Sequence, residues 1–111
     1  MQSQQSLIQQ GDVLIFTNSE LPGDATPVKP KNGQLVLAEG EATGHAHTVN
    51  LMEFPGVELF QSGTSKFLRC AAPVEIVHQE HHKVKLPKGC HKIGIVQEVD
   101  PFTQEIHSVK D

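Results

Sequence analysis

Short apolar runs bounded by turn residues recur along the chain. Residues 13–16 form the first run, and residues 34–39 form the second. Residues 18–33, which lie between them, carry three prolines and two glycines, a density of breakers that excludes a helix. Asn32-Gly33, at the end of that segment, is typical of a tight hairpin turn. The two runs are therefore predicted to be β-strands.

The same pattern continues towards the C-terminus. Turn residues there separate further expected strands at residues 45–51, 57–60, 66–70, 74–77, 83–86, 91–96 and 104–109. Seven to nine short antiparallel strands at this spacing favour an all-β fold, either a barrel or a sandwich. A helix over residues 74–82 is the main alternative, because His78 and His81 would then share a face. Pro73 and the β-branched residues that follow it favour a strand.

Length and composition indicate a single domain. The chain has 111 residues, of which 37% are hydrophobic, with no Trp or Tyr and five Phe. We expect residues 1–10, which are rich in Gln and Ser, to form a flexible tail, and residues 11–111 to form one all-β domain. A thin aliphatic core is expected to need support from a homo-oligomer or a bound ion.

Charge and cysteine content exclude several classes of protein. The net charge is −4, and the short basic run near residues 81–92 is too small to predict nucleic-acid binding. No apolar stretch approaches the ~20 residues of a membrane span, and no signal peptide is visible. Cys70 and Cys90 do not form a CxxC pair. We expect a cytoplasmic protein with two free thiols, with a disulfide between them as the alternative.

The chemistry of the chain is concentrated in two short histidine clusters. Five of the seven histidines lie in residues 44–47 and 78–82. On a strand, His45 and His47 would project from one face with Cα atoms ~6.6 Å apart, and two such imidazoles can converge on one metal ion. That face continues to Val49, so the pair is predicted to point inwards. The alternative is a surface pair, hydrogen-bonded near a turn.

The second cluster supplies candidate partners for the first. Strand alternation places His78 on the face of Ile76 and places His81 with Lys83, although the turn can re-aim these side chains. Glu80 would bind a metal, orient a histidine or act as a base. The alternative is a polar turn with solvated imidazoles. His91, His107 and Cys70 are expected to be structural.

Glu41 is the other candidate acid or base. It lies four residues before His45, where its carboxylate would accept a hydrogen bond from an imidazole N–H or simply belong to a turn. We therefore predict Glu41 and Glu80 as the catalytic candidates, and His45, His47, His78 and His81 as the metal ligands.

Three motifs resemble a group of small uncharacterised bacterial proteins. The motifs are Gly-Glu-x-Thr-Gly-His-x-His at residues 40–47, His-x-Glu-His at residues 78–81 and Leu-Pro-x-Gly at residues 86–89. The pattern extends from Gly-Asp-Val-Leu at residues 11–14 to Gln-Glu at residues 97–98. The resemblance implies no activity, but it singles out the same four histidines.

A second resemblance is to cupins. His45, His47 and Glu53 are similar to the first cupin metal motif, and Pro87-x-Gly89-x-His91 is similar to the second. Glu53 follows His47 later than in that motif, and only one residue separates Gly89 from His91. These departures weigh against Glu53 and His91 as ligands.

Metal binding is the first functional hypothesis. The ion would be zinc, iron or nickel, bound by His45 and His47 together with His78 or His81. An open coordination position would allow metal-assisted hydrolysis with Glu41 or Glu80 as base. The second hypothesis is a non-enzymatic assembly module, in which a homo-oligomer contact contains histidines that respond to pH. The sequence indicates no substrate.

Overall fold

The computed structural model describes residues 5–39, 45–95, 97–99 and 106–108. In these ranges the regular structure is entirely β, with twelve short strands and no helix, and therefore no helix that could cross a membrane. The largest sheet is antiparallel and has the strand order β1-β2-β10-β7-β6-β3. Its strands are β1 (Leu7–Gln10), β2 (Val13–Phe16), β3 (Thr26–Val28), β6 (Val57–Ser62), β7 (Ser65–Cys70) and β10 (Gly89–Ile95).

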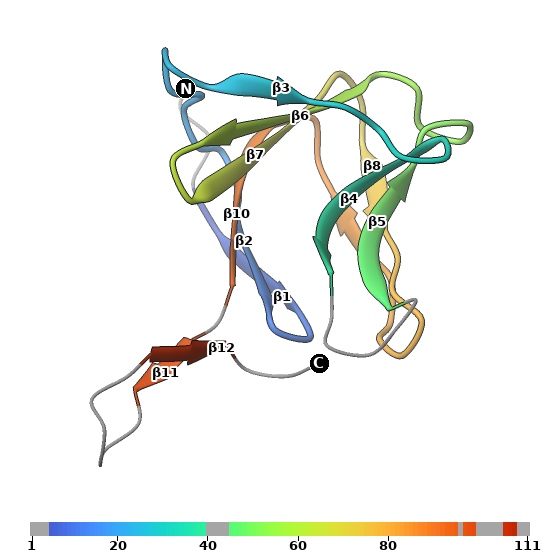
Figure 1. Ribbon diagram of the computed structural model, residues 1–111. Coiled ribbons are helices and arrows are strands. Elements are labelled where there is room, and N and C mark those ends of the chain that lie inside the picture. The colour runs from blue at the N-terminus through green and yellow to red at the C-terminus, as the bar shows by residue number, and fades with distance from the viewer. Residues whose placement is uncertain (1–4, 40–44, 96, 100–105, 109–111) are drawn as a thin grey trace.

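Two hairpins form a second layer opposite this sheet (Figure 1). They pair β4 (Gln34–Glu39) with β5 (Ala46–Asn50), and β8 (Val74–Ile76) with β9 (Val84–Leu86). Backbone hydrogen bonds of 3.0 and 2.9 Å join the hairpins, between Thr48 in the middle of β5 and Val77 directly after β8. A third hairpin, β11 (Gln97–Val99) with β12 (Ile106–Ser108), lies apart from both layers in Figure 1.

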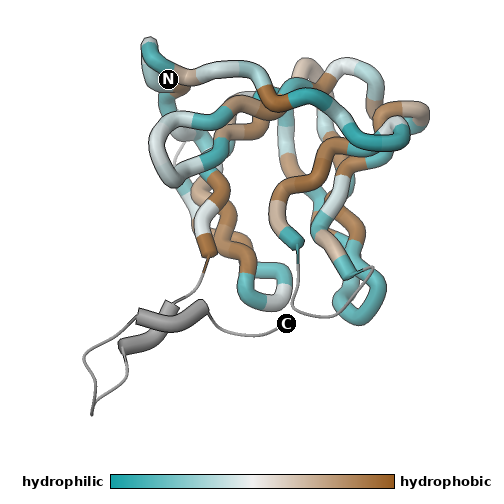
Figure 2. The backbone as a smooth tube through the Cα atoms, viewed as in Figure 1, coloured by the Kyte–Doolittle hydropathy of each residue, from teal (hydrophilic) through white to brown (hydrophobic). Residues whose placement is uncertain are grey.

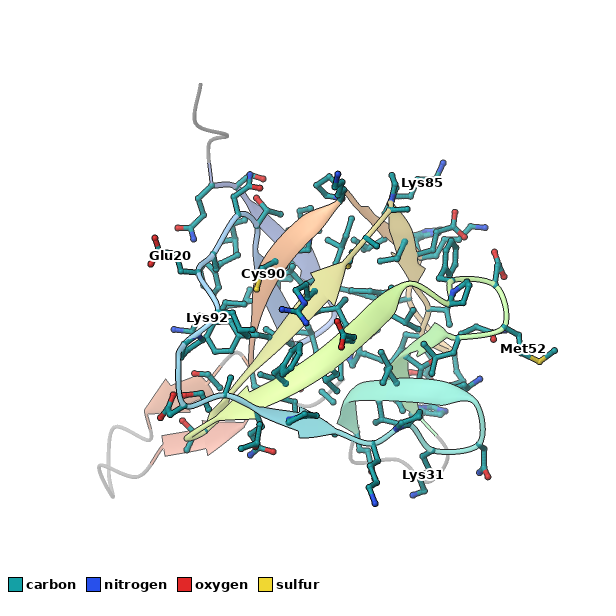
Figure 3. The ribbon with its side chains drawn as sticks, turned by 90° about the horizontal axis from the view of Figure 1, so that it is seen from above. Glu20, Lys31, Met52, Lys85, Cys90 and Lys92 are labelled. Carbon is teal, nitrogen blue, oxygen red and sulfur yellow. The ribbon has the colours of Figure 1, made fainter. Side chains whose placement is uncertain are left out.

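The hydrophobic core lies between the two layers. Strand alternation brings one face of each sheet inwards, and Figure 2 shows hydrophobic segments on strands of both layers. Figure 3 shows side chains between the layers, whereas Lys31 and Met52 lie at the periphery. The buried hydrophobic residues that pack together are Val13, Ile15, Leu35, Leu37, Val49, Val57, Leu59, Leu68, Cys70, Val74, Ile76, Leu86 and Ile93.

The predicted fold class is confirmed, in its sandwich form. The six-stranded sheet ends at β1 and β3, so it does not close into a barrel. The Asn32-Gly33 turn is also confirmed, because both residues have positive φ angles, 53° and 76°, and Lys31 and Gln34 exchange backbone hydrogen bonds across it. Asn and Gly are the residues that adopt this conformation at the least cost.

Two local details differ from the predictions. Residues 7–10, which we expected to belong to a flexible tail, form β1 and pair with β2. Backbone hydrogen bonds stabilise this strand, and a polar sequence does not reveal them. The described residues contain twelve strands rather than seven to nine, because several strands have only three residues. The strand favoured over a helix at the start of residues 74–82 is confirmed, because these residues contain β8 followed by a loop.

Candidate functional site

The fold brings the two histidine clusters together. The bridge between Thr48 and Val77 places His47 and His78 side by side, because each of these histidines directly neighbours a bridge residue. The ring centroids of His47 and His78 are 4.3 Å apart, and those of His78 and His81 are 4.5 Å apart. His45 lies 5.7 Å from His78 by the same measure. All four predicted metal ligands therefore belong to one imidazole cluster.

The burial of these rings follows the predicted strand alternation only in part. His47 is fully buried in β5, as the inward-facing prediction required, and His78 is buried as the continuation of β8. The loop over residues 79–82 then changes the alternation. His81, expected on the face of Lys83, packs instead against the cluster, while His82 is exposed. Side chains alternate between two faces only along an extended strand, so alternation does not predict their direction in the turn between two strands.

The rings pack against one another rather than form a coordination sphere, with His45 edge-on to His78 and the other three tilted or stacked. Two imidazoles bound to one ion by bonds of about 2.0–2.1 Å place their centroids about 5 Å apart in a tetrahedral site. The ring centroid of His78 lies closer than this to the centroids of both His47 and His81. The rings of His47 and His81 are nearly parallel to each other, and their centroids are 6.1 Å apart. Among the described residues, no group of three or more His, Cys, Asp or Glu side chains is arranged to bind a metal ion. The rings would have to turn to do so.

Gln10 determines which nitrogen of His47 carries a proton. The side-chain amide of Gln10 donates to the backbone carbonyls of Ile76 and His82, at 3.0 and 2.9 Å. The amide oxygen is therefore the atom that lies 2.8 Å from Nδ1 of His47. Since an amide oxygen only accepts hydrogen bonds, Nδ1 of His47 is protonated.

Asp12 faces the other nitrogen of His47. The carboxylate Oδ1 lies 3.3 Å from Nε2, and both residues are buried. Two arrangements produce this contact. Either His47 is an imidazolium that donates to Asp12, or a neutral ring presents its Nε2 lone pair and shares a cation with the carboxylate. Donor atoms of a tetrahedral site with bonds of about 2.0–2.1 Å lie about 3.3 Å apart, which is the observed separation.

His81 has a buried nitrogen that makes no hydrogen bond to the described residues. This atom, Nε2, packs against Gly11, where a Cβ atom would stand only 2.5 Å away. Buried imidazole nitrogens are usually paired, so an unpaired one indicates a partner that the described residues do not supply. Gly11 separates Gln10 from Asp12, and the β1–β2 turn therefore contacts two rings of the cluster.

The remaining predicted residues lie at the rim of the cluster. Glu80 is exposed, its carboxylate lies 3.9 Å from Nδ1 of His45, and its backbone N–H donates to Nδ1 of His78 at 3.1 Å. The amide oxygen of Gln79 accepts a 3.0 Å hydrogen bond from the backbone N–H of Ala46, which ties the two segments together. Glu41 lies outside the described residues.

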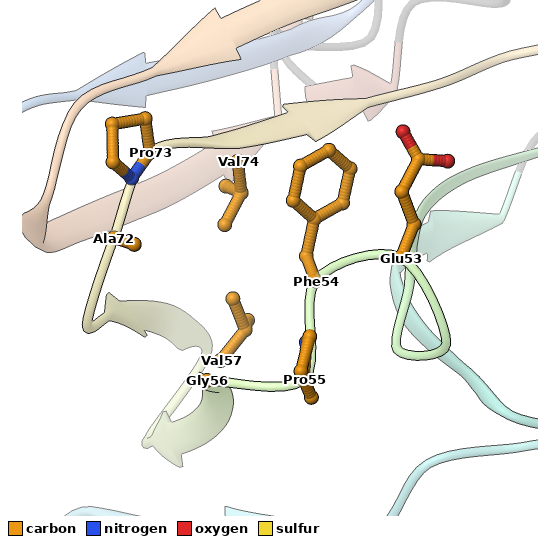
Figure 4. A pocket seen from close by; sticks show the side chains of 8 residues that line it. All are labelled: Glu53, Phe54, Pro55, Gly56, Val57, Ala72, Pro73 and Val74. Carbon is orange, nitrogen blue, oxygen red and sulfur yellow. The ribbon is translucent and has the colours of Figure 1, made fainter.

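His91 is structural, as expected. It is fully buried, Nε2 donates to the carbonyl of Pro87 at 2.7 Å, and Nδ1 accepts from the backbone N–H of Asn18 at 3.3 Å. Both nitrogens are therefore bonded to the backbone. The other cupin-like residue, Glu53, lines a pocket of about 210 Å³ together with Phe54, Pro55, Gly56, Val57, Ala72, Pro73 and Val74 (Figure 4). Neither residue belongs to the imidazole cluster.

The two cysteines are free thiols outside the cluster. Cys70 is buried in β7, and burial together with the neighbouring Cys90 raises its pKa from 9.0 to about 12. Burial also raises the pKa of Cys90, although Arg69 opposes that shift. Both thiols therefore stay protonated near neutral pH, which makes them poor metal ligands and poor nucleophiles.

Sequence reasoning missed Gln10 and Asp12. Gln10 falls in the expected tail, and Asp12 occurs only inside the Gly-Asp-Val-Leu motif at residues 11–14. One signal could have found Asp12, because the Gly11-Asp12 pair opens the motif shared with the resembling proteins.

A family model with the description "Domain of unknown function (DUF8820)" matches residues 9–95. The chain belongs to this family. The matched range contains the four clustered histidines as well as Gln10 and Asp12. No curated protein and no solved structure matches the chain. The match is consistent with the expected membership of an uncharacterised family, whereas neither the three motifs nor the likeness to cupins is confirmed by it.

Proposed function

We propose that the DUF8820 domain binds one divalent transition metal ion, zinc, iron or nickel, at the imidazole cluster. The observation that carries this proposal is the buried Nε2 of His81, which lacks a hydrogen bond from the described residues beside three other imidazoles. A bound ion would satisfy this lone pair, since neutral imidazole is the commonest side-chain ligand for such metals.

His47 and His81 are the best-placed ligands of the four. Gln10 occupies Nδ1 of His47, so a neutral His47 ring has its lone pair on Nε2. In a neutral His78 ring, Nδ1 accepts the backbone N–H of Glu80, so the proton lies on Nε2. His78 would have to give up that hydrogen bond to ligate. Of the two sequence alternatives, His78 and His81, the proposal therefore assigns the ligand role to His81.

The loop position of His81 allows the imidazole cluster to become a coordination site. His47 belongs to β5 and is held by Gln10, whereas His81 lies in the segment between β8 and β9. Binding would draw His81 towards His47 and turn the rings out of their parallel arrangement. His45 would serve as a further donor at the same ion.

The donor chemistry suits borderline metals. The cluster offers imidazole nitrogen, and both cysteine thiols lie elsewhere with raised pKa values. Imidazole-rich sites without thiolate suit zinc, iron and nickel. Metal-assisted hydrolysis is the finer form of the proposal, in which Glu80 at the rim would accept a proton from a metal-bound water.

The test is metal titration of protein prepared without a histidine tag and stripped with a chelator. Isothermal titration with Zn²⁺ should reveal one site in the wild type, and His81→Ala should weaken it at least about tenfold. His82→Ala is the matched control, because His82 is exposed and belongs to the same loop. Equal weakening by both variants, or no zinc binding by the wild type, would show that the proposal is wrong.

A further inference from the structure

We propose that Asp12 is a ligand of the same ion and that Gln10 is the positioning residue that sets the tautomer of His47. The inference rests on the proposed metal site. It adds an anionic oxygen donor from the opposite layer of the fold, which neither histidine motif supplies.

The orientation of Gln10 is determined by three hydrogen bonds. Its amide nitrogen donates to two carbonyls on the β8 side of the cluster, and its oxygen accepts the Nδ1 proton of His47. Flipping the amide would place an NH₂ group against Nδ1 and an oxygen against two carbonyls. The protein therefore determines that Nε2 of a neutral His47 carries the lone pair. Metal-binding histidines are commonly oriented by such a contact at the second nitrogen.

The position of Asp12 fits a ligand better than it fits a surface carboxylate. Its side chain is only 10% exposed, and Oδ1 faces Nε2 of His47. Nε2 carries no proton in a neutral ring, because Gln10 favours the tautomer protonated at Nδ1. The 3.3 Å separation of Oδ1 and Nε2 is the edge length expected for two donors of one tetrahedral ion. A carboxylate would also offset part of the charge of a divalent cation in this buried setting.

The β1–β2 turn delivers both residues to the cluster. Gln10 and Asp12 contact His47, and Gly11 between them lies on the ring of His81. Both histidines that we assign as the best-placed ligands are thus contacted by this turn. In this proposal the large sheet contributes Asp12 to the site, and the layer of hairpins contributes His47 and His81.

Zinc titration separates this inference from the proposed function. Asp12→Asn keeps the shape of the side chain and should weaken zinc binding at least about tenfold. Asp24→Asn is the control, because Asp24 is exposed, accepts a hydrogen bond from the hydroxyl of Ser62 and does not belong to the imidazole cluster. If Asp12→Asn binds zinc like the wild type while His81→Ala does not, Asp12 is not a ligand and the metal site stands. If the wild type does not bind zinc, both proposals fail.

The role of Gln10 is tested by ¹⁵N NMR of the imidazole nitrogens in the zinc-loaded protein near neutral pH, because without a cation the Nε2 lone pair of His47 would face the Asp12 carboxylate. The wild type should show His47 as the neutral tautomer protonated at Nδ1. Gln10→Met removes the acceptor and should produce a mixture of tautomers, whereas Gln10→Glu keeps an acceptor oxygen and should retain the wild-type signature. A His47 ring protonated at both nitrogens in the wild type would identify an ion pair with Asp12 and overturn the inference.

Discussion

The ring of His81 lies directly on Gly11. A Cβ atom at Gly11 would stand 2.5 Å from Nε2 of His81 and 2.7 Å from its Cδ2. Gly11 also has a φ angle of +58°, a conformation that L side chains rarely adopt. The absence of a side chain at Gly11 therefore both permits the β1–β2 turn and leaves room for an imidazole of the cluster.

The first prediction concerns this contact. Gly11→Ala should displace His81 and weaken zinc binding at least about tenfold, because the added methyl group occupies the place of the ring. It should also lower the free energy of unfolding by about 1 kcal/mol or more through backbone strain. Zinc titration and urea unfolding of the same variant measure the two effects.

Gly63→Ala separates the two effects. Gly63 has nearly the same φ, +59°, but no described atom lies within 4 Å of the place where its Cβ would be. This variant should show the strain and keep zinc binding unchanged. If the two variants bind zinc equally well, the contact between Gly11 and His81 does not matter for the site.

The second prediction distinguishes two fully buried histidines. His91→Leu should leave the Pro87 carbonyl and the Asn18 N–H without their side-chain partner, which costs about 1–3 kcal/mol of unfolding free energy. Zinc affinity should not change, because His91 does not belong to the cluster. Urea unfolding and zinc titration check the two statements. A loss of zinc binding in folded His91→Leu protein would place His91 in the site.

The third prediction concerns pH. The pKa of Cys70 is about 12 in the folded protein, against 9.0 for an unperturbed thiol. The unfolded chain therefore loses this proton first as the pH rises, so the contribution to stability is complete below pH 9.0 and is lost progressively towards about pH 12. Urea unfolding across this range should show a steeper loss for the wild type than for Cys70→Val. Equal slopes would contradict burial as the cause.

The fourth prediction tests the assembly hypothesis. We expect the chain to form a homo-oligomer, because its core is thin and β1 leaves an open sheet edge on which Leu7 is 57% exposed. Light scattering at about pH 7.5 and about pH 5.5 should detect the oligomer and any dependence on histidine charge. Leu7→Lys should favour the monomer, whereas Met52→Lys, on a 91% exposed side chain, should not. A wild-type monomer at both pH values would exclude this hypothesis.

Part of the candidate site could be predicted from sequence because strand alternation is local. The inward orientation of His47 follows from its spacing to Val49, and the burial of His78 follows from Ile76. The orientation of His81 could not be predicted in this way. It depends on a loop whose backbone leaves the strand period, and on a glycine far away in the sequence that makes room for the ring.

The sequence by itself determined the all-β class, the positions of most strands and the four histidines worth examining, since these depend on side-chain periodicity and turn residues over a few positions. Only the tertiary structure decided that the two motifs meet, through one backbone bridge between β5 and β8. It also decided that Gln10 and Asp12 join them. Asp12 is 35 residues away from His47 in the sequence, and Gln10 is 37 residues away from it. These contacts are made by polar side chains, whose burial depends on the packing of two layers rather than on any local pattern.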